Sequence, residues 1–170
     1  MGRNVWRWLA VMLAVVLVGL FRTAGAGDRE VVGGVTGNGD SALVKVGLSE
    51  GIGQWGIEAK WHPEVETTWF GVWGTLNTPE VPLLPEGSLP PFWKGLEAQG
   101  FIGVHILTDQ SFDRILTMPT VGVRVAPLET MSFVGEVGYP MGRAAAQGET
   151  GWDLNSVVFL FGLEIRFPLK

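Results

Sequence analysis

The stretch Ser-Val-Val-Phe-Leu-Phe-Gly-Leu-Glu-Ile-Arg-Phe, residues 156–167, decides the fold class. Every odd-numbered residue in it is large and apolar, whereas the even-numbered residues include Ser156, Gly162, Glu164 and Arg166. Successive side chains of a β-strand point to opposite faces of the sheet. This period of two therefore predicts a strand with one continuous apolar face and one mixed, partly polar face.

The same alternation recurs along the chain, and no segment holds a helical period. Turn-forming residues such as Gly37-Asn38-Gly39 separate the alternating segments. In the segment 65–76 the parity is ambiguous, with Trp69 and Trp73 on one side and Phe70 and Val72 on the other. The pattern predicts eight strands, at 28–36, 41–49, 51–62, 65–76, 92–107, 115–126, 130–139 and 156–167. Regularly spaced strands are typical of sandwiches and barrels, and we predict an all-β, antiparallel, up-and-down eight-stranded β-barrel.

The first 26 residues have the organisation of a secretory signal peptide. Arg3 and Arg7 precede an apolar run, residues 9–21, and the small residues Ala24 and Ala26 form a cleavage motif. The apolar run is about 13 residues long, whereas a membrane-spanning helix needs roughly 20. We therefore predict a cleaved signal peptide at 1–26 and a barrel domain at 27–170, with an uncleaved anchor helix as the alternative.

Composition excludes several classes of function. The 170 residues include no cysteine, which excludes disulfides and thiolate metal sites. Their formal net charge of −5 argues against nucleic-acid binding. His62 and His105 are the only histidines, and the acidic residues lack the spacing of metal ligands. We expect no cofactor and no metal.

The composition of the predicted polar face indicates that this face lines the lumen of the barrel. It holds small residues and a few charges of both signs, which suits a narrow, closed lumen in which buried charges pair. The apolar face carries aromatic residues near strand ends, for example Trp55, Trp61, Tyr139 and Phe167, as aromatic girdles do at membrane interfaces. We predict an inward-facing charge network of Lys45, Glu58, Lys60, Glu97, Arg124, Glu136, Glu164 and Arg166. The alternative is a secreted soluble barrel or sandwich that binds a small apolar ligand inside.

The chain after residue 26 resembles small eight-stranded outer-membrane barrels. The glycine-rich stretches 32–37 and 95–100 are similar to segments of the lipid A 3-O-deacylase barrels, and 159–167 resembles the closing strand of outer-membrane proteins. Here Phe167 is followed by Pro168-Leu169-Lys170. The deacylase resemblance implies a serine esterase with a His-x-Ser pair near the seventh strand. The corresponding residues 137–141 contain neither His nor Ser, so we assign no catalytic residue from this resemblance.

One further polar cluster, His105, Asp109 and Ser111, has the residue types of a nucleophile, a base and an orienting acid. The alternative is a lumen or rim histidine beside an ordinary polar loop. We favour a non-enzymatic outer-membrane barrel with a structural or interaction role and no open pore, because eight strands leave little lumen. The partners expected are outer-membrane lipids or lipopolysaccharide and the barrel-insertion machinery. A lipid A deacylase-like enzyme remains the alternative, and the oligomeric state is not predicted.

Overall fold

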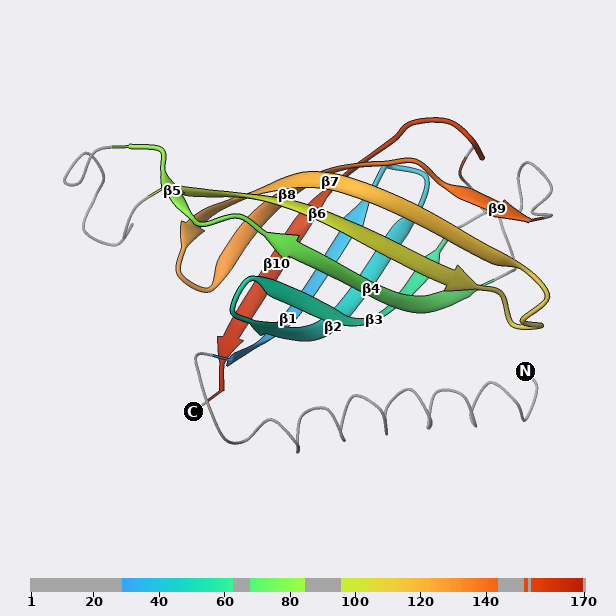
Figure 1. Ribbon diagram of the computed structural model, residues 1–170, viewed down its shortest axis with the longest axis horizontal. Helices are drawn as coiled ribbons and strands as arrows, with labels where there is room; N and C mark the ends of the chain where they lie inside the picture. Colours follow the sequence, from blue (N-terminus) through green and yellow to red (C-terminus); the bar gives the residue numbers. More distant parts are fainter. Residues whose placement is uncertain (1–28, 63–67, 85–95, 144–151, 153, 170) are drawn as a thin grey trace.

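The computed structural model describes residues 29–62, 68–84, 96–143, 152 and 154–169. Eight long strands form the body of the molecule, and each overlaps one of the eight predicted strands, which confirms the predicted fold class. They are β1 (Arg29–Gly37), β2 (Ala42–Glu50), β3 (Gly53–Trp61), β4 (Trp69–Asn77), β6 (Glu97–Thr108), β7 (Ile115–Leu128), β8 (Met131–Gly138) and β10 (Val158–Pro168). Two short strands, β5 (Val81–Pro82) and β9 (Met141–Arg143), extend the sheet beyond the ends of neighbouring long strands (Figure 1).

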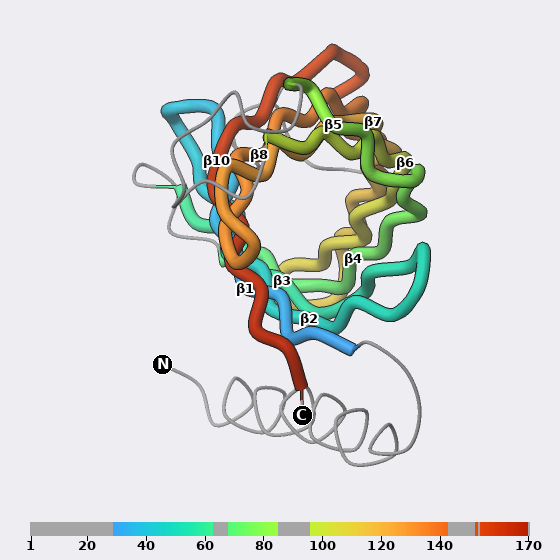
Figure 2. The backbone as a smooth tube through the Cα atoms, turned by 90° about the vertical axis from the view of Figure 1, so that its left-hand side faces the viewer, coloured from blue at the N-terminus to red at the C-terminus, as the bar shows by residue number. Residues whose placement is uncertain are grey.

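The long strands follow one another around a closed antiparallel ring. Each pairs with the long strand before it and the one after it in the chain. The ring closes where β1 pairs with β10, with Gly33 opposite Ile165 and Val35 opposite Leu163. Figure 2 shows this ring in a view along the barrel. The topology is therefore an up-and-down barrel without a free edge along its long strands.

Several predicted features fall outside the described residues. The signal peptide, 1–26, is one of them, as are the beginnings of the predicted strands at 65–76 and 92–107. Within the described ranges, no helix has both the length and the apolar character needed to cross a membrane.

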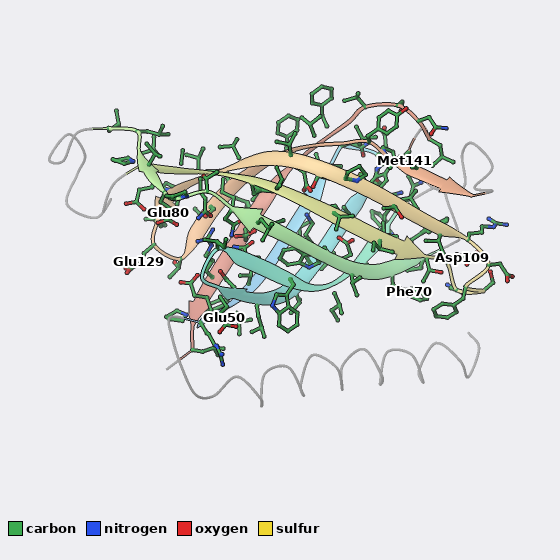
Figure 3. The ribbon with its side chains drawn as sticks, viewed as in Figure 1. Glu50, Phe70, Glu80, Asp109, Glu129 and Met141 are labelled. Atoms are coloured by element: carbon green, nitrogen blue, oxygen red, sulfur yellow. The ribbon has the colours of Figure 1, made fainter. Side chains whose placement is uncertain are left out.

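We name the two ends of the barrel by the strand termini they carry. The terminal end is where β1 begins and β10 ends, and it holds the turns around Glu50 and Glu129 (Figure 3). The distal end is where β1 ends and β10 begins, and it holds the connection around Asp109. Turns at the terminal end are tight between β2 and β3 and between β7 and β8, with two residues in each.

Side chains alternate sharply between the two faces of the barrel wall. Outward-facing residues are apolar and exposed, with Phe161 at 67% and Ile102 at 61% exposure. Inward-facing residues are mostly buried, and they include both polar and charged side chains. In β4 the ambiguity is resolved, because Trp69 and Trp73 point inward and are buried. On the outward face of the eight long strands, the described charged side chains are Arg29 and Glu50, which pair with each other at the terminal end.

Inward-facing glycines allow the barrel to be narrow. Each long strand contributes one at Gly34, Gly47, Gly56, Gly71, Gly103, Gly122, Gly138 and Gly162. Gly47 and Gly56 are direct partners in the β2–β3 register. A Cβ at Gly47 would collide with the carbonyl oxygen of Trp55, and a Cβ at Gly56 with that of Val46. Glycines at these positions let the wall bend and leave the interior to the larger side chains.

Candidate functional site in the barrel interior

A charged tetrad occupies the middle of the barrel. It consists of Lys45 on β2, Glu58 on β3, His105 on β6 and Glu136 on β8. Glu136 accepts a hydrogen bond from Lys45 Nζ at its Oε2, 3.0 Å away, and its Oε1 lies 2.6 Å from His105 Nε2. The other ring nitrogen, His105 Nδ1, lies 2.7 Å from Glu58 Oε2. Four strands, of which only β2 and β3 are consecutive in the chain, thus contribute to one interior network.

The tetrad geometry indicates the protonation state of its histidine. An ionised carboxylate only accepts hydrogen bonds, so a ring nitrogen bonded to one must carry a proton. Since both ring nitrogens of His105 meet carboxylate oxygens, the arrangement suits an imidazolium. Lys45 and His105 then balance Glu58 and Glu136, and the tetrad is neutral. Neutrality matters here because both carboxylates are fully buried, and an uncompensated buried charge is strongly destabilising.

A second charged cluster lies between the tetrad and the terminal end. Glu164 of β10 accepts from Arg124 Nε at 3.0 Å and from Arg166 Nε at 3.1 Å, so one carboxylate bridges two guanidinium groups. Arg124 also donates to Asn77 Oδ1 at 2.8 Å, and its guanidinium lies 4.1 Å from the ring centre of Phe101. The remaining charge of the cluster is met at the terminal end, where Arg166 NH1 lies 3.5 Å from Glu80 Oε1.

The distal part of the interior is apolar. Its buried cluster consists of Leu43, Trp69, Leu107, Leu116, Met118, Trp152, Val158 and Leu160. Lys60 of β3 points into this part and is only 1% exposed. Its Nζ lies 4.4 Å from the ring centre of Trp152, and among the described residues it has no hydrogen-bond partner. The indole nitrogen of Trp152 donates to Ser41 Oγ at 2.8 Å.

Side chains of the described residues occupy most of the barrel interior. A cavity of about 10 Å³, lined by Lys45, Trp73, Arg124 and Glu164 among others, has room for about one water molecule. Trp73 donates from its indole nitrogen to the carbonyl of Ile57 at 3.2 Å. The inward positions of Trp152 and Phe101 were not predicted from the sequence. For Phe101 there was a signal, because it shares its parity with His105.

The eight charges predicted to face inward separate into different settings. The structure brings Lys45, Glu58 and Glu136 into the tetrad, Arg124, Glu164 and Arg166 into the terminal cluster, and Lys60 into the apolar part. Glu97 joins neither cluster. It is the first residue of β6, it is exposed, and it pairs in register with Pro82 of the short strand β5.

The expected grouping of His105 with Asp109 and Ser111 does not form. His105 bonds to Glu58 and Glu136 in the middle of the barrel. Asp109 begins the connection after β6, about 13 Å further along at the usual rise of a strand. There it accepts from Ser111 Oγ at 2.9 Å. A base that does not reach the hydroxyl cannot activate it, so this set lacks the geometry of a catalytic triad.

Two other possible chemistries find no geometry in the described part of the chain. No group of three or more His, Asp or Glu residues there could hold a metal ion. Around Gly138, where the deacylase resemblance would place its catalytic pair, Val137 and Tyr139 face outward and Gly138 faces inward.

Comparisons with known proteins support the fold without naming a family. No protein-family model matches the chain, and no curated protein matches it in sequence. The fold is similar to a solved structure described as a de novo design of transmembrane beta-barrels, with a TM-score of 0.50. The two chains are 11% identical, over 83% of this chain and 96% of the other. At that identity the likeness is one of fold alone, that of a β-barrel.

Proposed function

We propose that this chain is an exported bacterial outer-membrane protein whose closed barrel spans the membrane and has a structural or interaction role. The observation that carries the proposal is the polarity of the wall, which is apolar outside and charged inside. A soluble barrel has the opposite arrangement, because its apolar side chains must leave water.

The outer surface fits a lipid environment along its length. Large apolar side chains such as Val123, Ile102 and Phe161 are 44%, 61% and 67% exposed, and exposed apolar surface on this scale is unusual in a soluble monomer. The long strands contain 8 to 14 residues, close to the roughly 9–11 that a tilted membrane-spanning strand needs. Outward-facing charges appear at the terminal end, at the ion pair of Arg29 and Glu50.

Aromatic side chains mark two levels on this surface. Trp61 and Tyr139 are exposed at the distal end, and Phe167 is exposed near the terminal end. Rings at these levels suit the two membrane–water interfaces, where Trp and Tyr are enriched. We infer that lipids or lipopolysaccharide cover the band between them, and that the barrel reaches the membrane through the barrel-insertion machinery.

The packed interior favours a structural or interaction role over solute conduction. The tetrad, the terminal cluster and the apolar cluster together occupy the interior, and the cavity among them holds about one water. Conduction of ions or nutrients would need a continuous aqueous path, which side chains in these positions block.

The proposal is tested by expressing the full chain with its N-terminal segment in a Gram-negative host. We expect the protein in the outer-membrane fraction, soluble only in detergent, with a band that shifts on gels after heating. Purified barrels placed in planar bilayers should give no stable conductance steps. A monodisperse protein in detergent-free buffer would refute the membrane assignment, and regular conductance steps would refute the closed interior. Unchanged lipid A acylation on expression would separate this role from that of a deacylase.

A further inference from the structure

Lys60 is the exception among the interior cations. Lys45, His105, Arg124 and Arg166 each have a carboxylate oxygen within 2.6 to 3.1 Å. Lys60 is 1% exposed, but among the described residues no carboxylate pairs with it and its Nζ has no hydrogen-bond partner. An ammonium group carries three donors, and leaving all of them unused in a buried place is costly. Among the described residues the position therefore lacks an acceptor, and an anion would supply it.

The ring of Trp152 occupies the place beside this ammonium. The ring centre lies 4.4 Å from Lys60 Nζ, and the face of an indole is a weak substitute for an anion. Trp152 is 3% exposed and belongs to the same buried apolar cluster as Trp69 and Leu160. Its nitrogen bonds to Ser41 Oγ, so a hydroxyl lies at the edge of the ring. The described surroundings of the ring thus combine apolar walls, one hydroxyl and one ammonium that has no hydrogen-bond partner among them.

The place is also at the mouth of the barrel. Ser41 precedes β2 in the turn from β1, and Trp152 lies in the connection from β9 to β10, both at the distal end. A molecule that replaced the ring would therefore enter from the distal end without passing the charged tetrad. It would be flat and apolar, to fit between the same walls, and it would bear a negative charge, to meet the ammonium.

We propose that Lys60, Ser41 and the apolar cluster around Trp152 form a binding site for a planar aromatic carboxylate of about the size of an indole, which takes the place of the Trp152 ring. The carboxylate accepts hydrogen bonds from Lys60 Nζ, and the aromatic part packs against the walls that now hold the indole. The site depends on the barrel fold and does not depend on the proposed role in the membrane.

The test uses the full chain in detergent micelles, with indole-3-carboxylate as the probe and indole as its neutral counterpart, measured by titration calorimetry. In Trp152→Ala, which vacates the site, we expect the carboxylate to bind roughly 10- to 100-fold more tightly than indole, as a charged hydrogen bond implies. Adding Lys60→Met should reduce carboxylate binding to the level of indole and leave indole binding unchanged. Arg29→Met, which removes one positive charge at the terminal end, is the matched control and should change neither.

A second measurement follows Trp152 in the unmutated protein. Its indole N–H signal in NMR spectra, assigned by its loss in Trp152→Phe, should move when the carboxylate displaces the ring from Ser41. The gel shift on heating checks that every variant is folded, and Lys60→Gln replaces Lys60→Met if that variant fails to fold. The proposal is overturned if both probes bind Trp152→Ala equally or not at all. It is equally overturned if Arg29→Met weakens carboxylate binding as much as Lys60→Met does.

Discussion

Substitution of Glu136 by Gln is the sharpest test of the interior network. Glu136 receives hydrogen bonds from two donors, Lys45 Nζ at 3.0 Å and His105 Nε2 at 2.6 Å. A glutamine in its place has one oxygen and one NH2 group, so one of the two donors meets another donor for as long as His105 keeps both ring protons. The tetrad then either carries a net positive charge, because Glu58 alone faces two cations, or His105 gives up its Nε2 proton and the imidazolium is lost. Removing one partner of a buried ion pair costs about 3–5 kcal/mol of the free energy of unfolding.

The matched control is Glu50→Gln, the same substitution in an ion pair of similar length whose carboxylate is 47% exposed instead of fully buried. Glu50 Oε1 lies 2.7 Å from Arg29 NH2, and solvent screening limits such a pair to about 0–1 kcal/mol. We expect Glu136→Gln to be several kcal/mol less stable than Glu50→Gln in urea unfolding of the barrel in detergent micelles, followed by tryptophan fluorescence.

A double variant tests whether charge balance is the cause. Lys45→Met together with Glu136→Gln removes one cation and one anion, and the amide oxygen can then accept from His105. The pair should be less destabilising than the sum of the two single variants by about 0.5–3 kcal/mol. Equal stability of Glu136→Gln and Glu50→Gln, or strict additivity in the double variant, would refute the neutral tetrad.

Three further predictions concern the barrel wall and Lys60. Gly162→Ala places a methyl group against the carbonyl of Val35 where β1 pairs with β10, so it should lower the free energy of unfolding by more than about 2 kcal/mol or prevent folding. Its control is Gly74→Ala, whose Cβ has ordinary contacts and which should change the free energy of unfolding by less than about 1 kcal/mol in the same urea assay. Val123→Arg puts a charge on the outward apolar face, and in lipid vesicles it should lower the free energy of unfolding by about 2–4 kcal/mol. Thr130→Arg, in a turn at the terminal end, should leave it nearly unchanged, and equal losses in the two variants would argue against lipid around β7. Lys60→Met removes a buried charge that has no carboxylate partner among the described residues. The free energy of unfolding, measured with heat or urea and without ligand, should therefore rise by more than about 1 kcal/mol, and a decrease would mean that the charge is compensated.

Much of the wall could be predicted from short stretches of sequence. In residues 156–167 the alternation alone placed Phe159 and Phe161 on one face and Glu164 and Arg166 on the other, as the structure has them. The reason is local, because the backbone of a strand turns consecutive side chains to opposite faces whatever surrounds it. The same argument was insufficient for β4, where both parities are apolar, and there the packing of Trp69 and Trp73 inside the barrel decided the faces.

The partners of the interior side chains could not be predicted in this way. Lys45 and Glu136 are 91 residues apart in sequence, and Arg124 and Glu164 are 40 apart. The members of each pair meet because the strands close into a ring with one particular register of pairing. Glu97 has the inward parity but lies beyond the ring, beside β5, so parity alone misplaced it.

The sequence by itself determined that the chain forms eight alternating strands and which face of most of them carries charge, because that information lies within each strand. Only the tertiary structure decided that the central charges form a neutral tetrad and that the ring of Trp152 lies against Lys60. Those outcomes depend on the stagger between strands and on the width of the barrel, which are properties of the closed ring.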